Sequence, residues 1–104
     1  MTKEEIFELY TQAVCDRFKV TANTQLFKKT KHREVVDARY TLYYMCSKRP
    51  MRISRIQRFM HNKGYDIAHS CIIYGVNQMS DMIKSDEDYK DLIKELEDYA
   101  VQLT

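Results

Sequence analysis

The scarcity of glycine and proline is the feature that most limits what this chain can fold into. Only two glycines and one proline occur in its 104 residues. Tight β-hairpin turns depend on glycine and similar turn-forming residues, so a sheet built of hairpins is disfavoured. The length suits one domain with a single hydrophobic core. We therefore expect one all-α domain over residues 1–104.

Apolar residues recur at steps of three and four positions, which is the spacing of amphipathic helices. This pattern predicts a compact bundle of five main helices, over residues 3–18, 34–47, 52–61, 65–84 and 86–103. Residues 20–27 are mostly polar, and we expect a connection whose one short helical turn buries Leu26 and Phe27. In the fourth helix the stripe predicts six inward positions, namely Ile67, Cys71, Tyr74, Gly75, Met79 and Met82.

Three residues are expected to set the helix ends. Pro50 should end the second helix, because the residue before a proline is pushed out of the α region. Gly64, or alternatively Asn62, can take the left-handed conformation that a sharp turn between helices needs. Ser85 is expected to cap the last helix, where the acidic residues 86–88 would meet the positive end of the helix dipole.

The location of the protein is suggested by what the sequence contains near its start and at its cysteines. No apolar run is long enough to span a membrane. The segment 1–5 is acidic on balance, with two glutamates and one lysine, where a signal peptide would be basic and then apolar. The three cysteines, at positions 15, 46 and 71, lack close spacing, and we expect each to be a buried, reduced thiol. These observations predict a cytoplasmic protein that is not secreted.

The charge of the chain is concentrated in its middle. Residues 28–63 hold eleven Lys/Arg and two acidic residues, a net charge of +9, whereas residues 1–27 sum to −1 and residues 64–104 to −6. Residues 28–33 have no apolar position at all, so we expect them to form a solvated basic loop. Concentrated positive charge usually serves a polyanionic partner, and nucleic acid is the first candidate.

The helices expected at 52–61 and 65–84 are joined by a short segment with a glycine, which is the pattern of a helix-turn-helix over 52–84. The second helix of such a unit enters the major groove of DNA and its first residues contact base edges. The predicted base-contacting residues are Lys63, Tyr65, Asp66 and His69. Lys63 could donate to guanine and Asp66 could accept from cytosine.

Three stretches carry a resemblance to a known family. They are the basic loop Lys28-Lys29-Thr30-Lys31-His32-Arg33 with the helix after it (Val35 to Met45), Ile53-Ser54-Arg55-Ile56-Gln57-Arg58-Phe59, and Tyr65-Asp66-Ile67-Ala68-His69-Ser70-Cys71. The chain resembles the C-terminal DNA-binding domain (domain IV) of the bacterial replication initiator DnaA, a Trp-repressor-like helix-turn-helix, from about Leu9 to Met82. Lys31 and Arg33 match basic-loop positions of that family, Arg39 matches its Ala-Arg pair, and His69 matches a later histidine.

The chain departs from this family where the family reads its target sequence. The family's Asp-His-Thr-Thr falls on Lys63, Gly64, Tyr65 and Asp66, so none of these positions matches. Two glycines cannot supply a phosphate-binding ATPase loop. The resemblance thus implies contact with double-stranded DNA. The two glycines imply that ATPase activity is absent, and the mismatched positions imply that the initiator box is not recognised. The residues expected at phosphates or the minor groove are Lys28, Lys29, Lys31, Arg33, Arg39, Arg52 and Arg55.

We therefore expect a stand-alone DNA-binding protein that is an accessory or regulator of replication or transcription, in a bacterial or phage-infected cell. The sequence has no spacing of nucleophile and base that would predict an enzyme, and nothing in it predicts a small-molecule substrate. His69 and Cys71 are only a pair of possible metal ligands, so we expect neither a metal nor a cofactor.

Two alternatives remain open. One is a helical interaction or structural module, including one in a virus particle, that uses its basic and acidic poles; its acidic last helix would bind a protein partner. The other is RNA binding, which needs exposed aromatic side chains for stacking, and Tyr65 is the one candidate.

Overall fold

The computed structural model describes all 104 residues and contains helices without any strand. Its elements are α1 (Lys3–Phe18), η1 (Ala22–Leu26), α2 (Arg33–Lys48), α3 (Ile53–Asn62), α4 (His69–Ser85) and α5 (Glu87–Gln102). The short element η1 is one π-type turn that ends at Leu26, and the side chains of Leu26 and of Phe27 after it are buried as expected. The prediction of an all-α bundle is confirmed.

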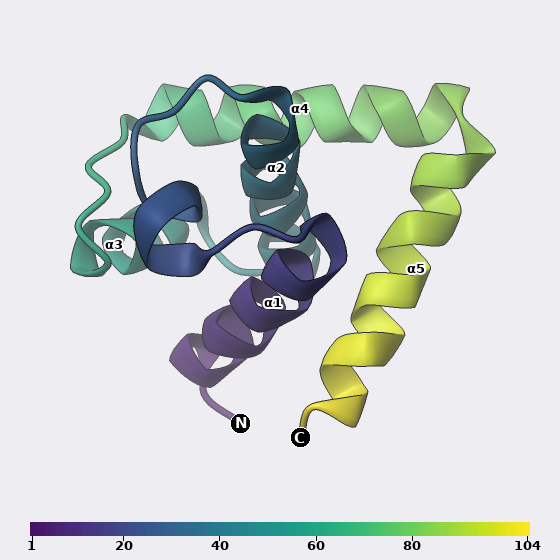
Figure 1. The fold of residues 1–104 in the computed structure, drawn as a ribbon, viewed down its shortest axis with the longest axis horizontal. Coiled ribbons are helices and arrows are strands. Elements are labelled where there is room, and N and C mark those ends of the chain that lie inside the picture. Colours follow the sequence, from purple (N-terminus) through teal and green to yellow (C-terminus); the bar gives the residue numbers. More distant parts are fainter.

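The helices surround α2, which contacts every other helical element. Figure 1 shows α1 and α2 in the middle of the molecule, α4 crossing one end, α3 on one side and α5 on the opposite side. The core draws fully buried side chains from all five α-helices, among them Phe7, Leu42, Ile56, Ile72 and Leu96. None of the helices combines the length and the apolar character that crossing a membrane requires.

The start of α4 differs from the prediction. α3 ends in a Schellman motif, in which Gly64 has a φ of +86°, Gly64 N–H donates to the His61 carbonyl at 2.9 Å and Tyr65 N–H donates to the Met60 carbonyl at 3.0 Å. The left-handed glycine was predicted, but Tyr65 belongs to this cap and not to the next helix. The chain then stays extended, so α4 begins at His69 and the connection between α3 and α4 has six residues, 63–68.

The inward face of α4 also differs from the predicted stripe. Gly75 and Met79 are buried as predicted, and Ile72 is buried in addition. Ile67 and Met82 are half-buried, whereas Cys71 is exposed and Tyr74 is 56% exposed. Gly75 faces α2 at close range, because a Cβ at this position would lie 2.7 Å from Tyr40 Cδ1. The absence of a side chain lets α4 approach α2 at this point, and the helix turns its glycine inward.

The cap of α5 is also different from the prediction. Asp86 is the capping residue, and its carboxylate accepts a hydrogen bond from Asp88 N–H at 2.9 Å. Ser85 is the last residue of α4, and its hydroxyl donates to the Asp81 carbonyl at 3.0 Å. The serine hydroxyl is thus used within α4, and a single residue separates the two helices.

The three cysteines fall into two classes, which predicts a selective thiol reaction. Cys15 and Cys46 are buried as expected, but Cys71 is exposed. Burial raises the pKa of Cys15 to about 11 and raises the pKa of Cys46 further, so both stay protonated and unreactive at neutral pH. We expect one equivalent of thiol to react with Ellman's reagent in the folded protein and three in denaturant. Two or more equivalents in the folded state would contradict this arrangement.

Candidate nucleic-acid interface

The basic loop is residues 28–32, which join η1 to α2. Its charged side chains Lys28, Lys29 and Lys31 are exposed, and so is His32. Arg33, which was expected to close this loop, is instead the first residue of α2. Its guanidinium lies 3.5 Å from the Asp37 carboxylate and remains 81% exposed, so this ion pair is a weak surface contact.

Arg39 fixes the backbone of this loop, and its guanidinium is bonded to backbone carbonyls. The side chain is 5% exposed, and its guanidinium donates from Nε to the Leu26 carbonyl at 2.9 Å and from Nη2 to the Lys28 carbonyl at 2.7 Å. A third bond runs from Nη2 to the Gln25 carbonyl at 3.4 Å. The expected phosphate contact of Arg39 is therefore wrong, since its guanidinium is hydrogen-bonded to the carbonyls where η1 ends.

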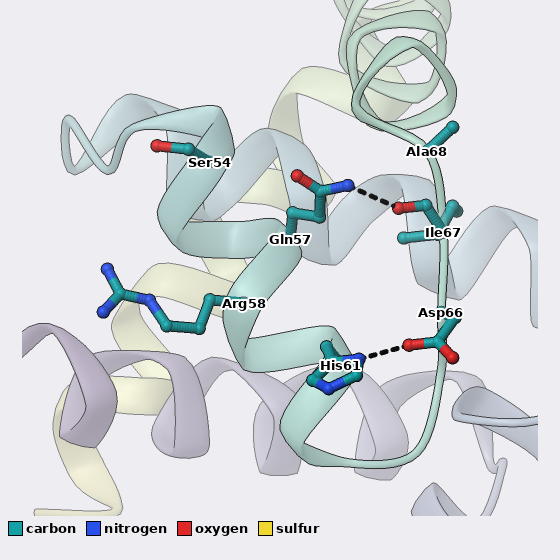
Figure 2. A pocket seen from close by; sticks show the side chains of 7 residues that line it. All are labelled: Ser54, Gln57, Arg58, His61, Asp66, Ile67 and Ala68. Carbon is teal, nitrogen blue, oxygen red and sulfur yellow. Dashed lines mark hydrogen bonds and ion pairs between the residues drawn. The ribbon is translucent and has the colours of Figure 1, made fainter.

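The arginines of the α3 segment form a second group of exposed cations. Arg52 precedes the first turn of α3 and is exposed, Arg55 is half-buried and Arg58 is exposed. Figure 2 shows Arg58 extending from α3 away from the connection to α4, whereas Gln57 and His61 face that connection. Arg52 and Arg58 thus present their guanidinium groups to the solvent and could reach a polyanion.

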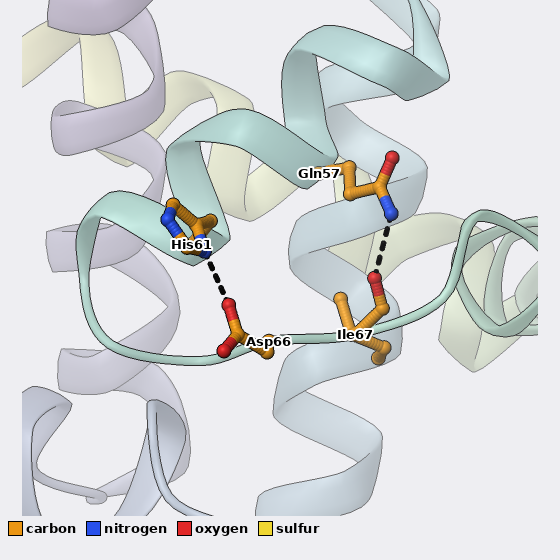
Figure 3. A network of polar contacts seen from close by, with 4 residues as sticks. All are labelled: Gln57, His61, Asp66 and Ile67. Atoms are coloured by element: carbon orange, nitrogen blue, oxygen red, sulfur yellow. Dashed lines mark hydrogen bonds and ion pairs between the residues drawn. The ribbon is translucent and has the colours of Figure 1, made fainter.

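Two side chains of α3 hold the connection to α4. Gln57 Nε2 donates to the Ile67 carbonyl at 2.9 Å, and the His61 ring pairs with the Asp66 carboxylate. Both contacts appear in Figure 3, where they tie one extended stretch of chain to one face of α3. A groove of about 470 Å³ lies between them, lined by Ser54, Gln57, Arg58, His61, Asp66, Ile67 and Ala68. The position of α4 relative to α3 is therefore fixed by polar contacts as well as by packing.

The four residues predicted to contact bases do not come together. The Lys63 ammonium pairs with the Glu8 carboxylate of α1 at 2.6 Å, and Tyr65 is 8% exposed with the Arg39 guanidinium 4.8 Å from its ring centre. Asp66 is exposed but lies in the connection and pairs with His61. Of the four, His69 alone occupies the first turn of the second helix, where it is exposed.

The exposed face of α4 was missed by the sequence reasoning. At helical spacing it presents the polar residues Ser70 and Asn77 together with Ile73 and Tyr74. α4 has no lysine or arginine before Lys84. This face follows once Ile72, Gly75 and Met79 are taken as the inward positions, because residues at steps of three and four share one side of a helix.

Most of the basic segment has no intramolecular counter-charge. Of its eleven cations, Arg33 and Lys63 are ion-paired and Arg39 is buried, which leaves eight that are at least partly exposed without a carboxylate partner. Residues 86–104, which include α5, hold seven acidic and two basic residues, a net charge of −5. Since α3 and α5 lie on opposite sides of the molecule, the cations of the α3 segment and the negative charge of α5 face opposite ways (Figure 1).

Comparison of the chain with protein-family models, with curated protein sequences and with solved structures finds no significant match.

Proposed function

We propose that the chain binds double-stranded DNA through the basic loop and the exposed arginines of the α3 segment, as an accessory or regulator of replication or transcription without ATPase activity. The observation that carries this proposal is the basic loop itself, whose lysines make no ion pair while its backbone is held by the buried Arg39. Unpaired charge on a fixed backbone is suited to phosphates, because binding then orders little additional chain.

The phosphate-contacting residues in this proposal are Lys28, Lys29, Lys31, Arg33, Arg52 and Arg58, with Arg55 at the edge of the set. Phosphate contacts position a protein on DNA without reading its sequence. Sequence preference would come from α4 as the second helix of a helix-turn-helix pair. His69, Ser70 and Asn77 are its exposed polar residues, and an asparagine side chain can pair with the edge of adenine. A modest sequence preference on top of strong electrostatic binding is the expected behaviour.

Fluorescence anisotropy across a salt series tests the proposal. If about five phosphates are neutralised, the logarithm of the affinity for random duplex DNA should fall against the logarithm of salt concentration with a slope of about −4 to −5. The same titration with single-stranded DNA and with RNA establishes whether the duplex is preferred. A slope near zero would contradict the electrostatic binding of DNA.

The charge distribution favours one second candidate, which is association with a protein. The acidic α5 and the basic α3 segment face opposite ways, so copies of the chain could associate head to tail, or α5 could bind a basic partner (Figure 1). Sedimentation velocity distinguishes this candidate from DNA binding. It predicts oligomers that grow with protein concentration and dissociate in salt, together with no mobility shift of duplex DNA.

A further inference from the structure

A cavity of about 470 Å³ lies where α2, the connection 63–68 and α4 meet, and its lining shares only Ile67 with that of the groove in Figure 2. Four tyrosines line it, Tyr40 and Tyr43 from α2, Tyr65 from the connection and Tyr74 from α4. Arg39 is the one charged residue in its wall. The volume lies within the range of sites for small organic ligands, which usually combine apolar walls with a few polar groups.

Tyr43 gives this cavity an unused hydrogen-bonding group. The side chain is completely buried, and its hydroxyl has no hydrogen-bond partner, although nearly all buried hydroxyls have one. The Tyr43 ring packs closely against Gly75 of α4, since a Cβ on this glycine would lie 3.0 Å from Tyr43 Cδ2. Burial raises the pKa of Tyr43, so the hydroxyl stays protonated and keeps its donor at neutral pH. A ligand acceptor would satisfy this group once the side chains that cover it in the cavity wall shift.

The other walls suit a flat aromatic ring. Tyr74 is 56% exposed and stands edge-on to Tyr40, with ring centres 6.1 Å apart and an angle of 76° between the planes. An exposed tyrosine ring offers a face on which any nucleobase can stack. No carboxylate lines the cavity, so nothing there would repel the phosphate that accompanies a base.

Arg39 connects this cavity to the basic loop. Arg39 lines the cavity, and its guanidinium donates to the Lys28 carbonyl at 2.7 Å, so one side chain contacts both the cavity and the backbone of the loop. A base held in the cavity would therefore lie one side chain away from the start of the basic loop. From this juxtaposition we propose that the tyrosine-lined cavity binds a nucleobase that is not stacked in a duplex, with its phosphate on the basic loop. The inference rests on the proposed binding of nucleic acid and adds a preference for an unpaired base.

The base could come from a strand or from a free nucleotide, and the experiment separates these sources. The probes are a perfect DNA hairpin, the same hairpin with a single bulged 2-aminopurine, and free 2-aminopurine nucleotide. Stacking on an aromatic side chain stabilises a bound base enough that the bulged hairpin should bind about 10-fold more tightly than the perfect one. The 2-aminopurine fluorescence should be quenched on binding.

Two variants and one matched control assign the effect to the cavity. Tyr74→Ala should abolish the 10-fold preference, and Tyr43→Phe, which removes only the unpartnered hydroxyl and keeps the packed ring, should reduce it at least 3-fold. Tyr99→Ala, which removes another exposed tyrosine on the distant α5, should leave the preference unchanged. If Tyr43→Phe and Tyr74→Ala keep the full preference, the cavity is not the site.

The outcomes distinguish this inference from the proposed function. Equal affinity of the two hairpins, with the steep salt dependence retained, would overturn the nucleobase site and leave DNA binding intact. Binding of the free nucleotide that Tyr43→Phe weakens, without binding of either hairpin, would support the site and overturn the proposed function. Absence of binding to all three probes would overturn both.

Discussion

Replacing Arg39 by methionine should lower the free energy of unfolding by about 3 kcal/mol, because each buried acceptor left without a partner costs about 1–3 kcal/mol. The guanidinium serves the carbonyls of Gln25, Leu26 and Lys28, which end η1 and begin the basic loop. Methionine retains much of the length and packing of the side chain but has no donor. Urea denaturation followed by circular dichroism measures the change.

The control for this prediction is Arg33→Met, six residues earlier on the same helix. Arg33 is exposed and makes one 3.5 Å ion pair, so its replacement should change the stability by less than about 0.5 kcal/mol. Arg39→Lys should fall between the two, since a single ammonium cannot reach three carbonyls in the way a fork of donors does. A stability of Arg39→Met within 0.5 kcal/mol of the original would contradict the anchoring role of Arg39.

Four of the five helix ranges follow from the sequence to within about one residue, because their apolar stripes are long and their ends are marked. The pattern at 3–18 is the range of α1, and the patterns at 34–47, 52–61 and 86–103 differ from α2, α3 and α5 by one residue at each end. In these helices local periodicity and tertiary packing agree, which makes a sequence easy to interpret.

The start of α4 was misjudged because Tyr65 fits two patterns. An apolar residue after a glycine can open the next helix, or it can pack back on the previous one as the last position of a Schellman motif. The structure follows the second course, with Tyr65 N–H on the Met60 carbonyl and the ring buried. Glycine followed by an apolar residue was a signal for this cap. Three of the four predicted base contacts were misplaced as a consequence.

The role of Arg39 could be predicted only in part. Steps of three and four residues place it beside Val35, Leu42 and Tyr43 on the inward face of α2, so its burial was readable from periodicity. Its partners were not readable, because the carbonyls of residues 25–28 reach it only through the path that the chain takes after η1. The sequence therefore indicated that this arginine is buried without indicating which groups it binds.

Replacing Lys28, Lys29 and Lys31 together by glutamine should weaken the binding of duplex DNA by roughly 100- to 1,000-fold at about 0.1 M salt, since each phosphate contact contributes about 0.9 to the salt slope. The slope itself should become less steep by about 2.7 for three lost contacts. All three side chains are exposed and make no ion pair, so the fold should retain its stability. Fluorescence anisotropy over a salt series measures both quantities.

The matched control removes the same charge from α5 and from the end of α4, outside the basic segment. Lys84, Lys90 and Lys94 are exposed lysines at the end of α4 and on α5, and their triple replacement by glutamine also lowers the net charge by three. If binding depends on the position of the cations, this variant keeps the original salt slope and most of the affinity. If it loses as much affinity as the loop variant, net charge alone governs binding. The basic loop would then be one part of a diffuse cationic field, and the anchoring of its backbone by Arg39 would serve the stability of the fold without serving the recognition of DNA.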